Sequence, residues 1–193
     1  MANHPPQINI DLDKIPLQPQ RWKYVLSLIL AQFNWRHAVK DKGVSFETME
    51  DRRQFLFRVF DTLLNNPIKT FKLDPRSLSG RHVDVLMKLW RQRAEAGDLS
   101  ASSVQKCHSM LRTFTAWIGK PNLVKPLSAY FDDVALYKRC YVAKVSKAPR
   151  ACGVDIDKLI SEIESSDVRA AAATRLMAAF GLRFKEAVMC RPH

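Results

Sequence analysis

An arginine and a glutamate lie three residues apart in the stretch AFGLRFKEAVMCRPH, which covers residues 179 to 193. The planar guanidinium of Arg183 can bind two oxygens of one phosphate, and such contacts stabilise the charge that builds up during phosphoryl transfer. A simpler alternative is a surface pair between Arg183 and Glu186 on one helical turn, worth about 0.3 kcal/mol. The two residues alone leave both interpretations open.

A second set of polar residues lies on one face of the stretch LSASSVQKCHSMLRTFTAWIGK, residues 99 to 120. Ser100 is a favourable helix N-cap and Gly119 a favourable helix end, so the sequence predicts a helix between them. Its apolar residues fall at helical spacing on one side: Val104, Cys107, Leu111, Phe114 and Ile118. The opposite face carries Ser102, Lys106, Ser109, Arg112 and Thr113.

This polar face has the chemistry of a DNA contact surface. Lysine and arginine neutralise phosphates, and short hydroxyls can approach a backbone oxygen or a base edge without filling the groove. The alternative is an ordinary solvent-exposed face, which would mix both signs of charge. No acidic residue occurs between Asp98 and Asp132, which favours the DNA interpretation.

The net charge of +12, from 31 Lys and Arg against 19 Asp and Glu, favours an anionic partner. Much of the excess lies in the middle of the chain. The segment YKRCYVAKVSKAPRACG, residues 137 to 153, contains no acid and is predicted either to bind DNA or to be a solvated linker. Its basic residues are Lys138, Arg139, Lys144, Lys147 and Arg150.

Several classes of protein are disfavoured by composition. The longest apolar run, Tyr24 to Ala31, is too short to span a bilayer, and the N-terminus lacks the pattern of a secretory signal. A cytosolic protein is therefore expected. The four cysteines are widely spaced and the five histidines show no ligand spacing, so neither disulfides nor a metal site is predicted. No cofactor and no small-molecule substrate is expected.

Helical periodicity dominates the chain, and strand signals are almost absent. Residues 1 to 20 hold four prolines and are predicted to form a flexible arm. Helices are expected over roughly 21 to 40, from the N-cap Ser45 to about Leu64, and from Ser79 to Gly97. Further helices are expected to start near Asp155 and Asp167, with a break at Gly181.

The motif Gly181-Leu182-Arg183-x-x-Glu186 resembles the first catalytic box of the tyrosine recombinases, the phage-integrase family. The stretch from residue 78 to 120 is similar to the core-binding domain of that family, where a helix ending in Trp and Gly precedes a basic linker. The resemblance covers about residues 78 to 193. Phe180 departs from the Thr that many members carry before the Gly.

The resemblance implies a role for each matching residue. Arg183 matches the catalytic arginine that clamps the scissile phosphate, and Glu186 matches the acidic position that supports it. The remaining catalytic groups of the family, including a His-x-x-Arg box and the tyrosine nucleophile, lie further toward the C-terminus than this sequence extends. The chain alone is therefore expected to be inactive, and whether it belongs to an enzyme stays open.

The expected fold is mainly α: a helical, SAM-like core-binding bundle, followed by the first helices of a truncated recombinase catalytic domain. The expected divisions are an arm over 1–20, a core-binding domain over 21–136, a basic linker over 137–153 and a catalytic-domain fragment over 154–193. The expected partner is double-stranded DNA, with self-association on DNA as in the full-length family and a nucleoid-associated location. Two alternatives are a non-enzymatic helical DNA-binding protein, such as a truncated mobile-element regulator, and a basic adaptor for an acidic protein.

Overall fold

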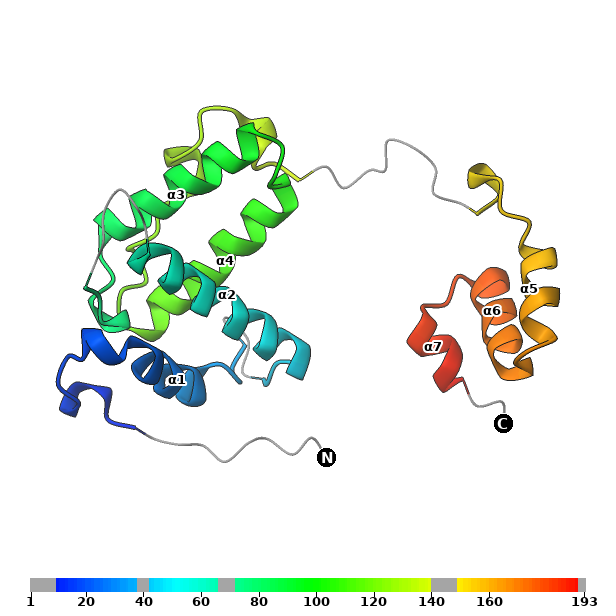
Figure 1. Cartoon of the computed structure of the whole chain (residues 1–193), viewed down its shortest axis with the longest axis horizontal. Helices are drawn as coiled ribbons and strands as arrows, with labels where there is room; N and C mark the ends of the chain where they lie inside the picture. Colours follow the sequence, from blue (N-terminus) through cyan, green and yellow to red (C-terminus); the bar gives the residue numbers. More distant parts are fainter. Residues whose placement is uncertain (1–9, 38–41, 66–71, 140–148, 191–193) are drawn as a thin grey trace. The chain divides into compact units, whose positions relative to one another are not determined.

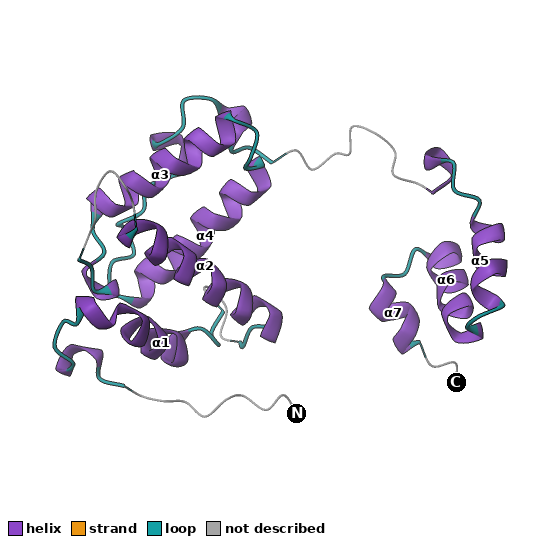
Figure 2. Ribbon diagram, viewed as in Figure 1, coloured by secondary structure: helices purple, strands orange, loops and turns teal. Residues whose placement is uncertain are grey.

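The chain is mainly helical and divides into two compact units, Met1–Arg139 and Cys140–His193. A computed structural model describes residues 10–37, 42–65, 72–139 and 149–190. Within these ranges the backbone forms α helices and short 3-10 turns, without strands, apart from an isolated bridge between Arg36 and Gly43 (Figure 2). The expected fold class, mainly α, is confirmed at this level.

The described residues of the N-terminal unit form four α helices, coloured from blue to green in Figure 1. They are α1 (Trp22–Phe33), α2 (Phe46–Leu64), α3 (Gly80–Glu95) and α4 (Ala101–Trp117). The 3-10 turns of this unit are η1 (Leu12–Lys14), η2 (Pro19–Arg21), η3 (Pro75–Ser77), η4 (Leu127–Ala129) and η5 (Val134–Leu136).

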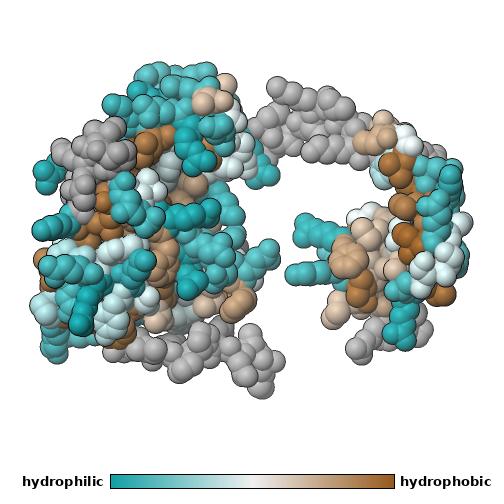
Figure 3. All heavy atoms as spheres, viewed as in Figure 1, coloured by the Kyte–Doolittle hydropathy of each residue, from teal (hydrophilic) through white to brown (hydrophobic). Residues whose placement is uncertain are grey.

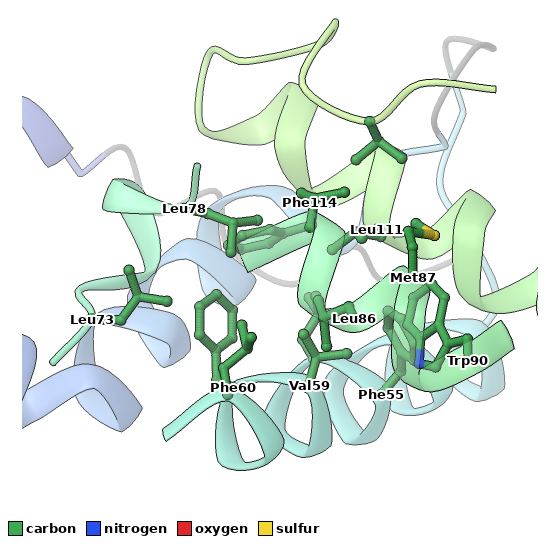
Figure 4. Close-up of a cluster of buried hydrophobic side chains, with 14 of the residues drawn as sticks. Phe55, Val59, Phe60, Leu73, Leu78, Leu86, Met87, Trp90, Leu111 and Phe114 are labelled. Atoms are coloured by element: carbon green, nitrogen blue, oxygen red, sulfur yellow. The ribbon is translucent and has the colours of Figure 1, made fainter. Parts of the chain in front are cut away.

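The core of this unit lies where α2, α3 and α4 meet (Figure 4). Phe60 of α2 and Phe114 of α4 are fully buried, and their rings meet edge to face with centroids 5.4 Å apart. Each large side chain buried in this way contributes about 1.5–3 kcal/mol. Leu86 and Met87 of α3 are buried in the same cluster of side chains.

Helix α1 ends earlier than its sequence predicts. We expected a helix to about residue 40, but α1 stops at Phe33 and residues 38–41 lie outside the described ranges. The reason is a long-range contact, because the buried guanidinium of Arg52 donates to the carbonyls of Asn34 (3.1 Å) and Arg36 (3.0 Å). These hydrogen bonds use carbonyls directly after α1 and stabilise a turn there, so the helix does not continue.

Part of the predicted flexible arm is bound to the bundle. The guanidinium of Arg76 donates to the carbonyls of Leu12 (2.6 Å), Ile15 (2.7 Å) and Pro16 (3.0 Å). Asp74, which pairs with Arg76 at 2.8 Å, also accepts the backbone N–H of Gln18 at 2.8 Å. Residues 12–18 are therefore a strap held by η3, whereas residues 1–9 lie outside the described ranges.

The C-terminal unit contains α5 (Ile156–Glu164), α6 (Val168–Phe180) and α7 (Phe184–Met189), preceded by η6 (Pro149–Cys152). Helices α5 and α6 start directly after Asp155 and Asp167 as expected, and these two side chains cap them. Gly181 ends α6 in the left-handed conformation, with φ of 65°, which glycine adopts without the penalty that a Cβ brings. Between residues 149 and 190, the buried residues are few and mostly small: Ile160, Ala171, Ala173 and Ala187.

Apolar side chains reach the surface of the C-terminal unit (Figure 3). Phe180 is 73% exposed, Phe184 is 67% exposed and Met189 is 74% exposed. These three residues lie at the end of α6 and along α7. Separately, no helix in the described ranges is both long enough and apolar enough to cross a membrane.

Candidate nucleic-acid interface

Helix α4 presents the polar face that the sequence predicts, because its opposite side is fixed in the core. Val104, Leu111 and Phe114 are completely buried, and Ser100 caps the helix by accepting the N–H of Ser103 at 3.2 Å. The rotation of α4 about its axis is set by these contacts. Ser102, Lys106, Ser109 and Arg112 are exposed, and Thr113 is half-buried.

Two members of this face already have partners within the protein. The Thr113 hydroxyl donates to the carbonyl of Ser109 at 3.0 Å. The ammonium group of Lys106 pairs with the carboxylate of Asp51 on α2 at 2.8 Å. The face is free of acids along the sequence of α4, but α2 brings a carboxylate to its edge. The pairing of Asp51 with Lys106 was not predicted from the sequence, because the two residues are 55 positions apart in the chain.

Arg112 has the opposite environment. Its side chain is exposed, and no carboxylate pairs with it among the described residues. On the same side of α4, His108 is buried and its Nε2 lies 2.8 Å from the carbonyl of Lys125. Burial lowers the pKa of His108; the bond to Lys125 opposes this shift and the charge of Arg112 adds to it. The imidazole is therefore neutral near pH 7, and the cation at this edge is Arg112.

The basic residues that follow α4 have different environments. Lys120 is structural, since its ammonium group donates to the carbonyls of Arg76 (2.8 Å) and Leu78 (2.9 Å). Lys138 and Arg139 are exposed at the end of the N-terminal unit. Two predicted contact residues, Lys144 and Lys147, lie outside the described residues, and the side chain of Arg150 in η6 is not described.

Arg183 occupies the N-cap position of α7, directly after Gly181 and Leu182. The carboxylate of Glu186 accepts the backbone N–H of Arg183 at 2.8 Å, so it caps the helix and fixes the backbone of the arginine. The guanidinium is exposed and has no ion-pair partner among the described residues. The simple surface pair between the two side chains, considered from the sequence, is thus not formed. Glu186 supports Arg183 through the backbone instead.

The two sets of candidate residues belong to different units. Ser102, Lys106, Ser109 and Arg112 are brought together by one helix of the N-terminal unit, and Arg183 belongs to the C-terminal unit. Comparison of the chain with known protein families, with curated proteins and with solved structures finds no match.

Proposed function

We propose that this chain binds duplex DNA, as the N-terminal part of a site-specific tyrosine recombinase. The observation that carries the DNA part of the proposal is the exposed face of α4, where Ser102, Ser109 and Arg112 lie together without a carboxylate on the same helix. A helix of this kind fits the major groove of B-DNA, which is about 12 Å wide. Hydroxyls and an unpaired guanidinium then meet base edges and phosphates.

The recombinase part of the proposal rests on Arg183 and its resemblance to the first catalytic arginine of that family. An exposed guanidinium on a backbone held by Glu186 can approach a phosphate without first breaking an ion pair. In the intact enzyme a tyrosine supplied from outside this sequence would attack the phosphate and form a covalent 3′-phosphotyrosyl link. Arg183 would stabilise the charge on the non-bridging oxygens.

The proposal includes a cytoplasmic, nucleoid-associated location and self-association on DNA. It competes with a non-enzymatic helical DNA-binding protein, which would have the same α4 surface. The reading frame beyond residue 193 distinguishes the two. The recombinase proposal requires a His-x-x-Arg box followed by a tyrosine, and a frame without them favours the non-enzymatic protein.

DNA binding is tested by measuring affinity for a duplex at several salt concentrations. If the chain neutralises about four to seven phosphates, the slope of log affinity against log salt is about −4 to −6. Replacing Lys106 and Arg112 together by Ala removes two of these contacts and weakens binding, while circular dichroism stays unchanged because both side chains are exposed. A flat salt response would contradict the proposal.

A matched control has the same loss of charge on other helices. Lys23 of α1 and Lys88 of α3 are also exposed, so their joint replacement by Ala lowers the net charge equally. We expect the control to retain more affinity than the α4 variant. Equal losses in the two variants would show that net charge, and not the face of α4, governs binding.

A further inference from the structure

A groove of about 450 Å³ lies between α2, α3 and α4, and its floor is apolar and aromatic. Phe55 of α2 and Trp90 of α3 are buried there with ring centroids 6.0 Å apart (Figure 4). Leu86 and Met110 line the same floor. A volume of this size is within the usual range of small-molecule sites, roughly 300–1,000 Å³. The floor suits a flat apolar group.

Three cationic side chains also line this groove, Arg58, Arg93 and Lys106, together with two carboxylates, Asp51 and Asp61. Asp61 accepts a hydrogen bond from the side-chain amide of Asn65 at 2.9 Å. Lys106 is paired with Asp51. Arg58 donates from Nε to the backbone carbonyl of Gln54 at 3.3 Å, so its terminal nitrogens are not used by that bond. Neither Arg58 nor Arg93 pairs with a carboxylate among the described residues. Two guanidinium groups are therefore available at the edge of an apolar floor.

The half-buried thiol of Cys107 lines the same groove as the three cations. Burial raises the pKa of Cys107, and the charges of Arg58, Arg93 and Lys106 each oppose that rise. Each of the three charges is therefore close enough to the sulfur to act on it electrostatically. An anion near Cys107 would therefore be within the field of both unpaired guanidinium groups.

We propose that this groove is a binding site for a small molecule that combines a flat apolar body with one anionic group. The body packs on Phe55 and Trp90, and a carboxylate, sulfonate or phosphate is held by Arg58 and Arg93. The site does not depend on the proposed function, because the outward residues Ser102, Ser109 and Arg112 of α4 are not among its lining residues. Lys106 alone belongs to both surfaces.

The test uses the anionic dye 1-anilinonaphthalene-8-sulfonate and the alkylation of Cys107 by iodoacetamide, followed by peptide mass spectrometry on the full chain. The dye is expected to slow alkylation of Cys107, while Cys152, which is exposed in the other unit, serves as the internal standard. The uncharged analogue N-phenyl-1-naphthylamine has the same aromatic body. We expect it to protect Cys107 at least tenfold less effectively, because it lacks the group that Arg58 and Arg93 bind.

Two pairs of variants locate the anion. Arg58→Gln and Arg93→Gln should each raise the half-protecting dye concentration about tenfold. Their controls, Arg53→Gln and Arg91→Gln, remove a cation from the same helices outside the groove and should leave that concentration unchanged. Titration of dye fluorescence in the same four variants gives a readout that does not depend on thiol reactivity.

The proposal is overturned by either of two results. One is equal protection of Cys107 by the charged and the uncharged dye, which would make the groove an apolar cleft without anion recognition. The other is a dye affinity, by fluorescence, that is the same in the two groove variants and in their controls. Arg53, Arg58 and Arg93 are exposed, and Arg91 is half-buried with only exposed carboxylate partners, so circular dichroism is expected to show the same helicity in each variant.

Discussion

Single residues with buried charges set the N-terminal strap in place. Asp74 and Arg76 are the most buried ion pair among the described residues, with side chains 2% and 13% exposed. Burial opposes the ionisation of Asp74, but hydrogen bonds from Arg76 and from the Gln18 N–H outweigh it and lower the pKa of the carboxyl. Desolvation destabilises the two buried charges, and these hydrogen bonds offset that penalty. The stability of the fold is therefore sensitive to the loss of either residue.

We predict that Arg76→Met lowers the free energy of unfolding by about 3 kcal/mol, because it leaves the carboxylate of Asp74 buried without its partner. It also removes the donors to three strap carbonyls. Urea denaturation measures the loss. The control is Arg53→Met, whose exposed pair with Glu50 should contribute less than about 1 kcal/mol. Similar losses in both variants would show that the strap is not held by Arg76.

His108 gives the protein a dependence on pH. Its folded-state pKa is lowered, first by burial, from an unfolded value of about 6.5. A lowered pKa means that the stabilising contribution is complete above about pH 6.5 and is lost as the pH falls through the folded-state value. His82 is shifted in the same direction by burial, and its Nδ1 accepts the Ser79 N–H at 3.0 Å, which requires that nitrogen to be unprotonated.

We therefore predict that the free energy of unfolding is nearly constant between about pH 7 and 8 and falls below about pH 6.5. His108→Gln retains a side chain that can donate to the Lys125 carbonyl but does not titrate. It should reduce the slope without abolishing it, since His82 remains. Urea denaturation at a series of pH values measures the slope in both proteins. An unchanged slope in the variant would exclude His108 as its source.

At the scale of helices, local signals were predictable and long-range contacts were not. The N-caps Ser45 and Ser100 and the helix starts near Asp155 and Asp167 are confirmed, because each depends on a side chain and the next three residues. The predicted end of α1 was wrong, because the actual end depends on a contact with Arg52, which lies in the next helix.

In the candidate site, too, local features were predictable from the sequence and long-range contacts were not. The outward face of α4 was predictable from periodicity, since burial of Val104 and Leu111 fixes which residues are exposed. The ion pair between Asp51 and Lys106 joins residues 55 positions apart, so it was not predictable without the packing of α2 against α4. The capping bond from Glu186 to the backbone of Arg183 was also missed, although the capping-box spacing of three residues could have indicated it.

The pairing of α2 with α4 leads to a prediction about DNA affinity. If DNA binds to this face as proposed, a phosphate replaces the carboxylate of Asp51 at Lys106. Asp51→Asn should raise the affinity for duplex DNA and leave the log–log salt slope unchanged, because Lys106 then meets the same phosphate without first losing an ion pair. Glu47→Gln, on the exposed first turn of the same helix, is the matched control for net charge. Equal gains from the two variants would contradict a specific role for Asp51.

At the scale of the whole molecule, the two units differ in how completely they bury their apolar residues. The N-terminal unit has a continuous core that includes Phe60, Leu86 and Phe114. The C-terminal unit buries mainly alanines and leaves Phe180, Phe184 and Met189 in solvent. Its short helices leave apolar surface uncovered at Phe180, Val188 and Met189, whereas Ile160 is buried.

This difference predicts unequal stability along the chain. Each exposed large side chain forgoes about 1.5–3 kcal/mol of burial, and a helix as short as α7, with 6 residues, has little stability of its own. Hydrogen exchange on the full chain should therefore show protection across residues 100–118 and faster exchange after residue 155. Exposed apolar patches also favour association, so protection after residue 155 should increase with protein concentration. Phe180→Ser with Phe184→Ser should remove that concentration dependence without affecting residues 100–118. Uniform protection of both units in a monomer would show that the C-terminal unit is stable without further apolar contacts.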